Sequence, residues 1–112
     1  MANEPMRVPW MHSLILTTAN TVYNLYTLIS AITPLMPVFA KSAKIQVDIS
    51  AGAAKVYVGS PDSLATNDCG AALVATQVFD TSAFVSDACK LPDIALMADT
   101  NLTQVNVTIF VQ

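Results

Sequence analysis

Histidine is the side chain most often used for acid–base chemistry near neutral pH, and this 112-residue chain has one, His12. Nucleophilic catalysis also requires a serine or cysteine within reach of the base, and a third group that orients the base. His12 stands directly after Trp10 and Met11, and no motif around it supplies those partners. We therefore expect a structural or interfacial histidine, no catalytic residues, and a protein that is not an enzyme.

The two cysteines, Cys69 and Cys89, lie twenty positions apart. A disulfide between them would close a loop and stabilise the fold by roughly 3 kcal/mol. Two buried thiols, in a protein made in a reducing cytosol, are the alternative that we favour while leaving the disulfide open. Together with the distant His12 they cannot fill a four-ligand zinc site. We expect no metal and no cofactor.

The distribution of charge bears on the possible partners. Four basic and two acidic residues in residues 1–57 give +2, and one basic and six acidic residues in 58–112 give −5, which sum to the net charge of −3. Nucleic-acid binding requires clustered lysines and arginines, which this chain lacks.

Asp62 and Asp68 could line a calcium loop, but their spacing matches no calcium motif. Pro34 and Pro37 interrupt the apolar stretch that could otherwise span a membrane. We expect neither nucleic acid nor membrane as a partner.

An uncharged segment, Val8 to Ala40, precedes all the clear strand patterns. The whole chain is 54% hydrophobic and only 12% charged, against about 25% charged residues in a typical domain. Large neutral surfaces on a small domain usually mark an interface. The segment is therefore expected to lie against its own core or against another protein.

The N-terminal part of the chain predicts an arm followed by one strand and one helix. Pro5 and Pro9 favour extended backbone, so residues 1–11 are expected to form an extended arm. Residues 12–18 predict a first strand. Apolar residues then recur at three- and four-residue steps, which predicts a short helix near residues 20–32. These are Val22, Leu25, Tyr26, Ile29 and Ile32.

From Leu35 the apolar residues alternate, which is typical of strands with one buried face. Residues 44–49 and 55–59 predict an antiparallel hairpin, and 60–70 a loop. Further strands are expected at 72–79, 93–98 and 103–111, while 80–92 stays unassigned. This spacing predicts a single mainly β domain over residues 12–112, an antiparallel β-sandwich. Three glycines make a tight barrel less favourable.

Parts of residues 44–111 resemble a type of small virion protein of tailed phages. The resemblance rests on KIQV at 44–47, VYVGS at 56–60, LPDIALMAD at 91–99 and VNVTI at 105–109. With its size and neutral N-terminal region, the chain resembles the head cement or decoration ("staple") proteins of epsilon15-like short-tailed bacteriophages. The resemblance implies a jelly-roll-like sandwich that clamps neighbouring major capsid proteins, and it supplies no catalytic residues.

The sequence thus leads to a structural virion protein on the capsid exterior, made in the host cytoplasm. Its expected partners are the major capsid protein and itself, as a homo-oligomer in which a dimer is preferred to a trimer. The alternative is a tail or fibre-associated sandwich module that binds a host receptor or glycan through Tyr57 and residues 60–70. The expected interface residues, chosen because large apolar side chains dominate interface energies, are Pro9, Trp10, Met11, Tyr23, Tyr26 and Phe110.

Overall fold

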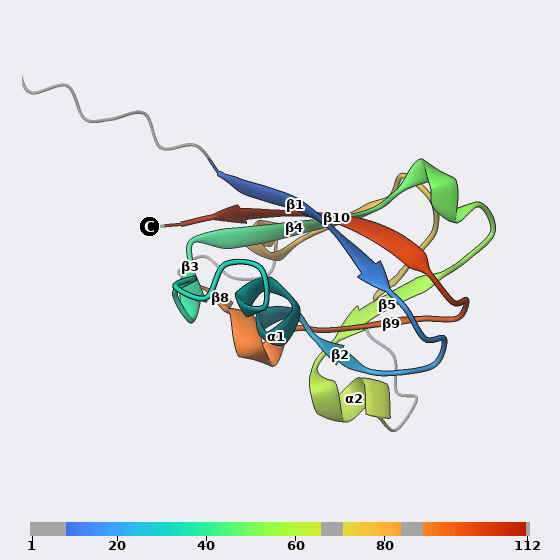
Figure 1. The fold of residues 1–112 in the computed structure, drawn as a ribbon, viewed down its shortest axis with the longest axis horizontal. Coiled ribbons are helices and arrows are strands. Elements are labelled where there is room, and N and C mark those ends of the chain that lie inside the picture. The colour runs from blue at the N-terminus through green and yellow to red at the C-terminus, as the bar shows by residue number, and fades with distance from the viewer. Residues whose placement is uncertain (1–8, 66–70, 84–88, 112) are drawn as a thin grey trace, which may run out of the picture.

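The computed structural model describes residues 9–65, 71–83 and 89–111 of the chain. It is a mainly β protein in which two four-stranded antiparallel sheets face each other (Figure 1). The expected antiparallel sandwich with one short helix near residues 20–32 is confirmed. Residues 1–8, which make up most of the expected arm, lie outside the described residues.

The first sheet has the strand order β1-β10-β4-β7 and contains the longest strands. Its strands alternate between buried and more exposed residues, because every second side chain points into the space between the sheets. The expected strand at 103–111 is confirmed within one residue. The strands are β1 (Trp10–Leu16), β10 (Thr103–Phe110), β4 (Ser42–Val47) and β7 (Val78–Asp80).

Shorter strands, in the order β2-β9-β5-β6, form the second sheet. A separate two-stranded ribbon joins β3 to β8. The second sheet consists of β2 (Tyr23–Asn24), β9 (Ala95–Ala98), β5 (Val56–Gly59) and β6 (Ala71–Leu73), and the ribbon of β3 (Phe39–Ala40) and β8 (Cys89–Lys90). The helices are α1 (Leu25–Ser30) and α2 (Pro61–Ala65), with 3₁₀ turns η1 (Ile49–Ala51), η2 (Thr81–Ala83) and η3 (Leu91–Asp93).

One hydrophobic core lies between the two sheets and beneath α1. Burying one such aliphatic side chain stabilises a fold by about 1.5–3 kcal/mol, so this layer holds the sheets together. Its fully buried members include Leu16, Ile45, Val105 and Ile109 of the first sheet, Val56 and Leu96 of the second, and Leu25 and Ile29 of α1.

Helix α1 is shorter than the helical period suggested. The side chain of Asn24 accepts a hydrogen bond from the backbone N–H of Thr27 at 3.3 Å, which caps the helix at its N-terminus. The helix ends at Ser30, and Ile32 lies beyond it with an exposed side chain. Two apolar positions of the sequence pattern, Val22 and Ile32, therefore lie outside the helix on its two sides.

The expected hairpin between residues 44–49 and 55–59 is wrong. Strand β4 pairs with β10 and β7 in the first sheet, whereas β5 pairs with β9 and β6 in the second. The carboxylate of Asp48 accepts from the N–H of Ser50 at 3.0 Å and caps η1, which turns the chain from one sheet toward the other. Both strands bury alternate residues, but they bury them from opposite sides of the core.

Two further expectations need correction. The strand expected at 72–79 is two short strands, β6 and β7, which belong to different sheets and are separated by a turn where Thr76 has a φ of 70°. The loop expected at 60–70 begins with the helix α2. Proline is favoured in the first turn of a helix, so Pro61 starts α2 rather than preventing it. The rest of the expected loop, residues 66–70, lies outside the described residues.

Candidate functional site

The side of the first sheet that faces away from the core is the candidate site, and we call it the outer face. Its members follow from the strand register, in which Ser13 and Gln46 both lie opposite Asn106, and Val78 lies opposite Gln46. The outer face consists of Met11, Ser13 and Ile15 of β1, Gln104, Asn106, Thr108 and Phe110 of β10, Ser42, Lys44 and Gln46 of β4, and Val78 and Asp80 of β7.

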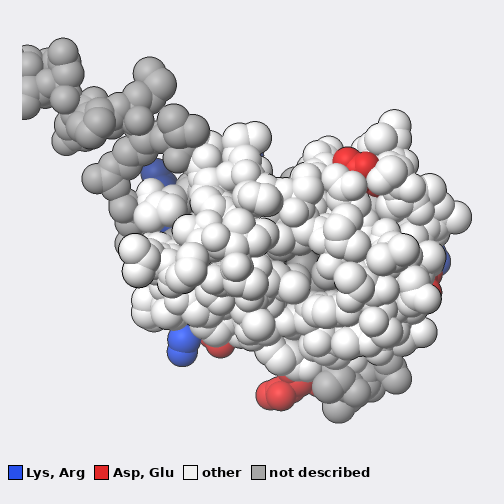
Figure 2. Space-filling model, viewed as in Figure 1, with Lys and Arg blue, Asp and Glu red and all other residues white. Residues whose placement is uncertain are grey.

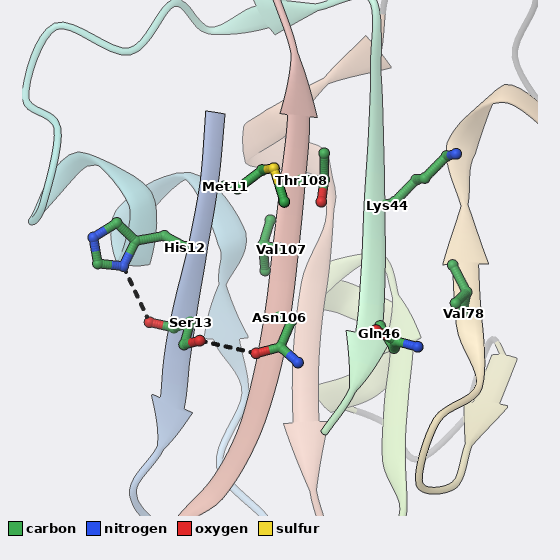
Figure 3. A pocket seen from close by; sticks show the side chains of 9 residues that line it. All are labelled: Met11, His12, Ser13, Lys44, Gln46, Val78, Asn106, Val107 and Thr108. Atoms are coloured by element: carbon green, nitrogen blue, oxygen red, sulfur yellow. Dashed lines mark hydrogen bonds between the residues drawn. The ribbon is translucent and has the colours of Figure 1, made fainter. Parts of the chain in front are cut away.

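A shallow open depression of about 650 Å³ lies on this face. Met11 on β1 and Val78 on β7 stand on its two sides, with exposed fractions of 66% and 49% (Figure 3). Asn106, Thr108 and other side chains of the middle strands lie between them. The depression thus has an apolar rim on two sides and a floor of amide and hydroxyl groups.

Hydrogen bonds fix the polar floor of this depression. The hydroxyl of Ser13 donates to Asn106 Oδ1 at 2.9 Å, and Asn106 Nδ2 donates to Asp48 Oδ1 at 2.9 Å. Gln46 Nε2 donates to the carbonyl oxygen of Thr76 at 3.2 Å. Hydrogen bonds from Ser50, and then from Asn106, lower the pKa of the Asp48 carboxyl below its ordinary value. The floor is thus held in place before any partner arrives.

Opposite charges nearly cancel at the β7 side of the outer face. The Lys44 ammonium lies 3.9 Å from the Asp80 carboxylate and 5.5 Å from the centre of the Phe110 ring. Hydrogen bonds from the backbone N–H and hydroxyl of Ser82 lower the pKa of Asp80. An exposed pair of this kind adds little to stability. Its consequence is a face with almost no net charge.

Apolar side chains also gather in a turn over residues 31–39, which we call the apolar turn. It lies at the end of the molecule where β1 starts and β10 finishes, beside α1, β3 and β8 (Figure 1). Leu35 is 92% exposed there, although leucine normally avoids water. Phe39 and Ile32 are exposed as well. On the face drawn in Figure 2, charged side chains lie mainly toward the rim and leave the middle uncharged.

Two hydrogen bonds hold the apolar turn against the rest of the fold. Trp10 Nε1 donates to the Thr33 hydroxyl at 2.9 Å, and the Tyr26 hydroxyl donates to the Met36 carbonyl oxygen at 2.9 Å. Both bonds involve half-buried groups, so their loss would leave poorly hydrated polar atoms. Leu35, between these two attachment points, is therefore held outward by a fixed turn.

The structure places only two of the six residues expected at the interface on the outer face. Met11 and Phe110 lie on the outer face, and Pro9 is half-buried immediately before β1. Trp10, in contrast, points toward the core, with its indole N–H bonded to Thr33. The remaining two, Tyr23 and Tyr26, are half-buried, and their hydroxyls bond to Thr17 and to the Met36 carbonyl oxygen.

Several exposed apolar residues were missed by sequence reasoning, above all Leu35, Phe39, Ile15 and Val78. A signal for Leu35 was present, because it stands between Pro34 and Pro37, where the chain must turn at the surface. For Val78 there was none, since it belonged to a run that predicted one continuous strand over residues 72–79.

The uncharged segment, Val8 to Ala40, was expected to lie either against its own core or against another protein, and its residues divide between buried and exposed positions. Leu14, Leu16, Leu25 and Ile29 lie in the core. Five of the ten large hydrophobic side chains exposed in the described part of the chain also belong to this segment. It therefore builds part of the core and also supplies much of the exposed apolar surface. The five are Met11, Ile15, Ile32, Leu35 and Phe39.

In the part of the chain that it describes, the structure does not bring together the histidine and cysteines that were considered for catalysis, a disulfide or a metal site. The His12 ring stacks on Trp10, with 5.3 Å between ring centres, and its Nδ1 lies 3.3 Å from the Ser13 carbonyl oxygen. Cys89 is buried and forms no disulfide with a described residue, while Cys69 lies outside the described residues. Within the described ranges, no group of three His, Cys, Asp or Glu side chains could hold a metal ion.

Comparisons with known proteins add no relative: no protein-family model, no curated protein and no solved structure matches the chain. Among the described residues, no helix has both the length and the apolar character needed to cross a membrane. The outer face and the apolar turn therefore have to be interpreted from their own chemistry.

Proposed function

We propose that this chain is a structural virion protein that binds the outside of a phage capsid and cements neighbouring major capsid proteins. The observation that carries the proposal is the outer face, a neutral and partly apolar sheet surface that no described segment of the chain covers. The resemblance of residues 44–111 to phage cement proteins supplies the class of partner.

The physical demand on a cement protein fits such a surface. Packaged DNA pushes shell subunits apart, and a protein bound across a seam resists because separation re-exposes the buried contact. Covering about 400 Å² of apolar surface contributes roughly 10 kcal/mol before the cost of association is subtracted. Since the outer face has almost no net charge, its contacts would change little with salt concentration outside the host.

The direct test measures binding of the purified protein to empty shells assembled from a phage major capsid protein. Met11→Asp and Val78→Asp place a charge on either side of the depression and should weaken binding about tenfold or more each, because each charge would lose water on docking. Leu102→Asp is the matched control. Leu102 is exposed in the turn between β9 and β10 and does not line the depression, so its variant should bind as wild type does.

The arm was expected over residues 1–11, but Trp10 and Met11 belong to β1. Removal of residues 1–8 therefore tests the remainder of the expected arm and leaves β1 complete. We expect this truncation to weaken shell binding while the unfolding transition stays unchanged. Binding of all these variants with wild-type affinity would refute the docking surface. Retention of the wild type on host-cell envelopes, with none on shells, would instead favour the receptor-binding alternative.

A further inference from the structure

Strand β1 forms an unusually open edge of the sandwich. It has seven residues and lies at the end of the first sheet, paired with β10 on one side. The other edge strands of the two four-stranded sheets, β7, β2 and β6, have three, two and three residues. Folded proteins normally shorten, charge or cover an edge to prevent unwanted pairing. All seven residues of β1 are free of formal charge, and no described segment pairs with its outer edge.

The backbone groups at this edge point away from the sheet. In an antiparallel pair, successive residues direct their N–H and C=O groups alternately toward the partner and away from it. The Ser13 carbonyl oxygen points away from β10, where it meets His12 Nδ1 at 3.3 Å (Figure 3). By the same alternation, the N–H and C=O groups of Met11 and Ile15 also point to the open edge.

We propose that β1 pairs antiparallel with β1 of a second copy about a two-fold axis at Ser13, which joins two four-stranded sheets into one. At this register Ser13 lies opposite Ser13 of the partner copy, and Met11 lies opposite Ile15 of the partner copy. About six backbone hydrogen bonds would form, two for each of the three facing pairs. The His12 contact with the Ser13 carbonyl oxygen would be replaced by an N–H from the second copy.

The sequence of β1 favours a copy of itself over another strand as the occupant. Met11 and Ile15 are 66% and 44% exposed, stand two positions on either side of Ser13, and would cover each other in both halves of the symmetric pair. Apolar side chains directly opposite each other stabilise paired strands. No charged residue meets a like charge across the axis, because β1 carries none.

Charge exchange tests the register on the isolated protein, so it does not depend on the capsid proposal. Wild-type protein should dimerise over the micromolar range in analytical ultracentrifugation. The double variant M11K/I15K, and separately M11E/I15E, should each weaken dimerisation about tenfold or more, because like charges face each other twice. An equimolar mixture of the two should recover association. A mixture that stays monomeric, or a wild type that is monomeric throughout, would overturn the pairing.

A proline substitution tests the backbone bonds at the centre of the interface. The Ser13 N–H points away from β10, so Ser13→Pro removes no backbone hydrogen bond within the sheet but removes the central donor of each copy. Ser13→Ala, which loses the same hydroxyl bond to Asn106 and keeps the N–H, is the matched control. Dimerisation should be lost in Ser13→Pro and kept in Ser13→Ala. Equal dimerisation of the two variants would contradict the proposed pairing. Circular dichroism checks that both variants fold, and the charge exchange decides the question if the proline variant does not.

Discussion

The two sheets of the sandwich differ in what covers their outer sides. All four residues of β9, in the second sheet, are buried. Leu64 of α2 packs against Ala95 and Met97 of that strand, with Val22 and Tyr57 beside them. In the first sheet, β10 alternates between buried and half-buried residues, and the outer face holds the open depression. Within the described residues, the chain covers the second sheet with its own helix and leaves the outer side of the first sheet uncovered.

This difference indicates where a partner would bind. Two sheets need only one core between them, so a further apolar layer on one outer side must come from elsewhere in the chain or from another protein. Helix α2 supplies that layer on the second sheet. On the first sheet, Met11, Ile15 and Val78 remain exposed among polar neighbours. The comparison predicts that substitutions on the covered side affect stability and that those on the uncovered side affect binding.

The largest expected effect on stability comes from removing the cover of the second sheet. Leu64→Ala should lower the free energy of unfolding by about 2–4 kcal/mol, because it removes a fully buried side chain and leaves a cavity over β9. Leu102→Ala is the matched control, since the same side chain is 70% exposed there. Its effect should stay within about 0.5 kcal/mol. Urea unfolding measures both, and equal losses would contradict the assigned role of α2.

The sequence did not predict helix α2, because its first residues are also typical of turns. Turns commonly contain residues such as Ser60, Pro61 and Asp62. Proline and acidic residues are also favoured in the first turn of a helix. Leu64 is the one large apolar residue among residues 60–65, which is too few to establish a helical period. Its burial depends on β9, which lies some thirty residues further along the chain.

Strand positions were more predictable than strand partners. The alternation over 103–111 fixed which residues of β10 point inward, because one buried face imposes a period of two. The same alternation in β4 and β5 could not say that they belong to different sheets. Of the candidate site, Met11 and Phe110 were identified from their size and position. Val78 was missed because its exposure depends on β7 being an edge strand of the first sheet.

A smaller effect is expected where the apolar turn is attached to α1. Tyr26→Phe removes the hydroxyl that donates to the Met36 carbonyl oxygen, and should cost about 1 kcal/mol because the bond is half-buried. Tyr23→Phe removes a hydroxyl whose contacts with the Thr17 hydroxyl and the Thr18 N–H are both exposed, so water can replace them and we expect a cost below about 0.5 kcal/mol. Thermal and urea unfolding compare the two variants. A larger loss for Tyr23→Phe would show that the turn is held by other contacts.

Acid should destabilise the folded domain through three carboxyls, two of them at the first sheet and one at the second. Hydrogen bonds hold the pKa values of Asp48 and Asp80, beside the first sheet, below 3.8, and the backbone N–H of Lys55 does the same for Asp99 at the second. A lowered pKa in the folded state stabilises above the unfolded value and is lost as pH falls through the folded value. Stability should therefore decrease as the pH is lowered below about 4.

Amide variants separate the two contributions. The D48N/D80N double variant should flatten the acid dependence more than D99N does, because it removes two of the three shifted carboxyls. Urea unfolding at pH steps between about 5 and 2 measures the slopes. Identical slopes in the double variant and the wild type would mean that these hydrogen bonds do not persist in solution.

The smallest effect on stability is expected at the depression of the outer face. Met11→Gln and Val78→Thr keep nearly the same volume and make exposed side chains polar, so each should change the free energy of unfolding by less than about 0.5 kcal/mol. The same variants should weaken shell binding, because the apolar rim would no longer gain from leaving water. A stability loss comparable to that of Leu64→Ala would mean that the rim packs within the chain's own fold, and the contrast between the two sheets would disappear.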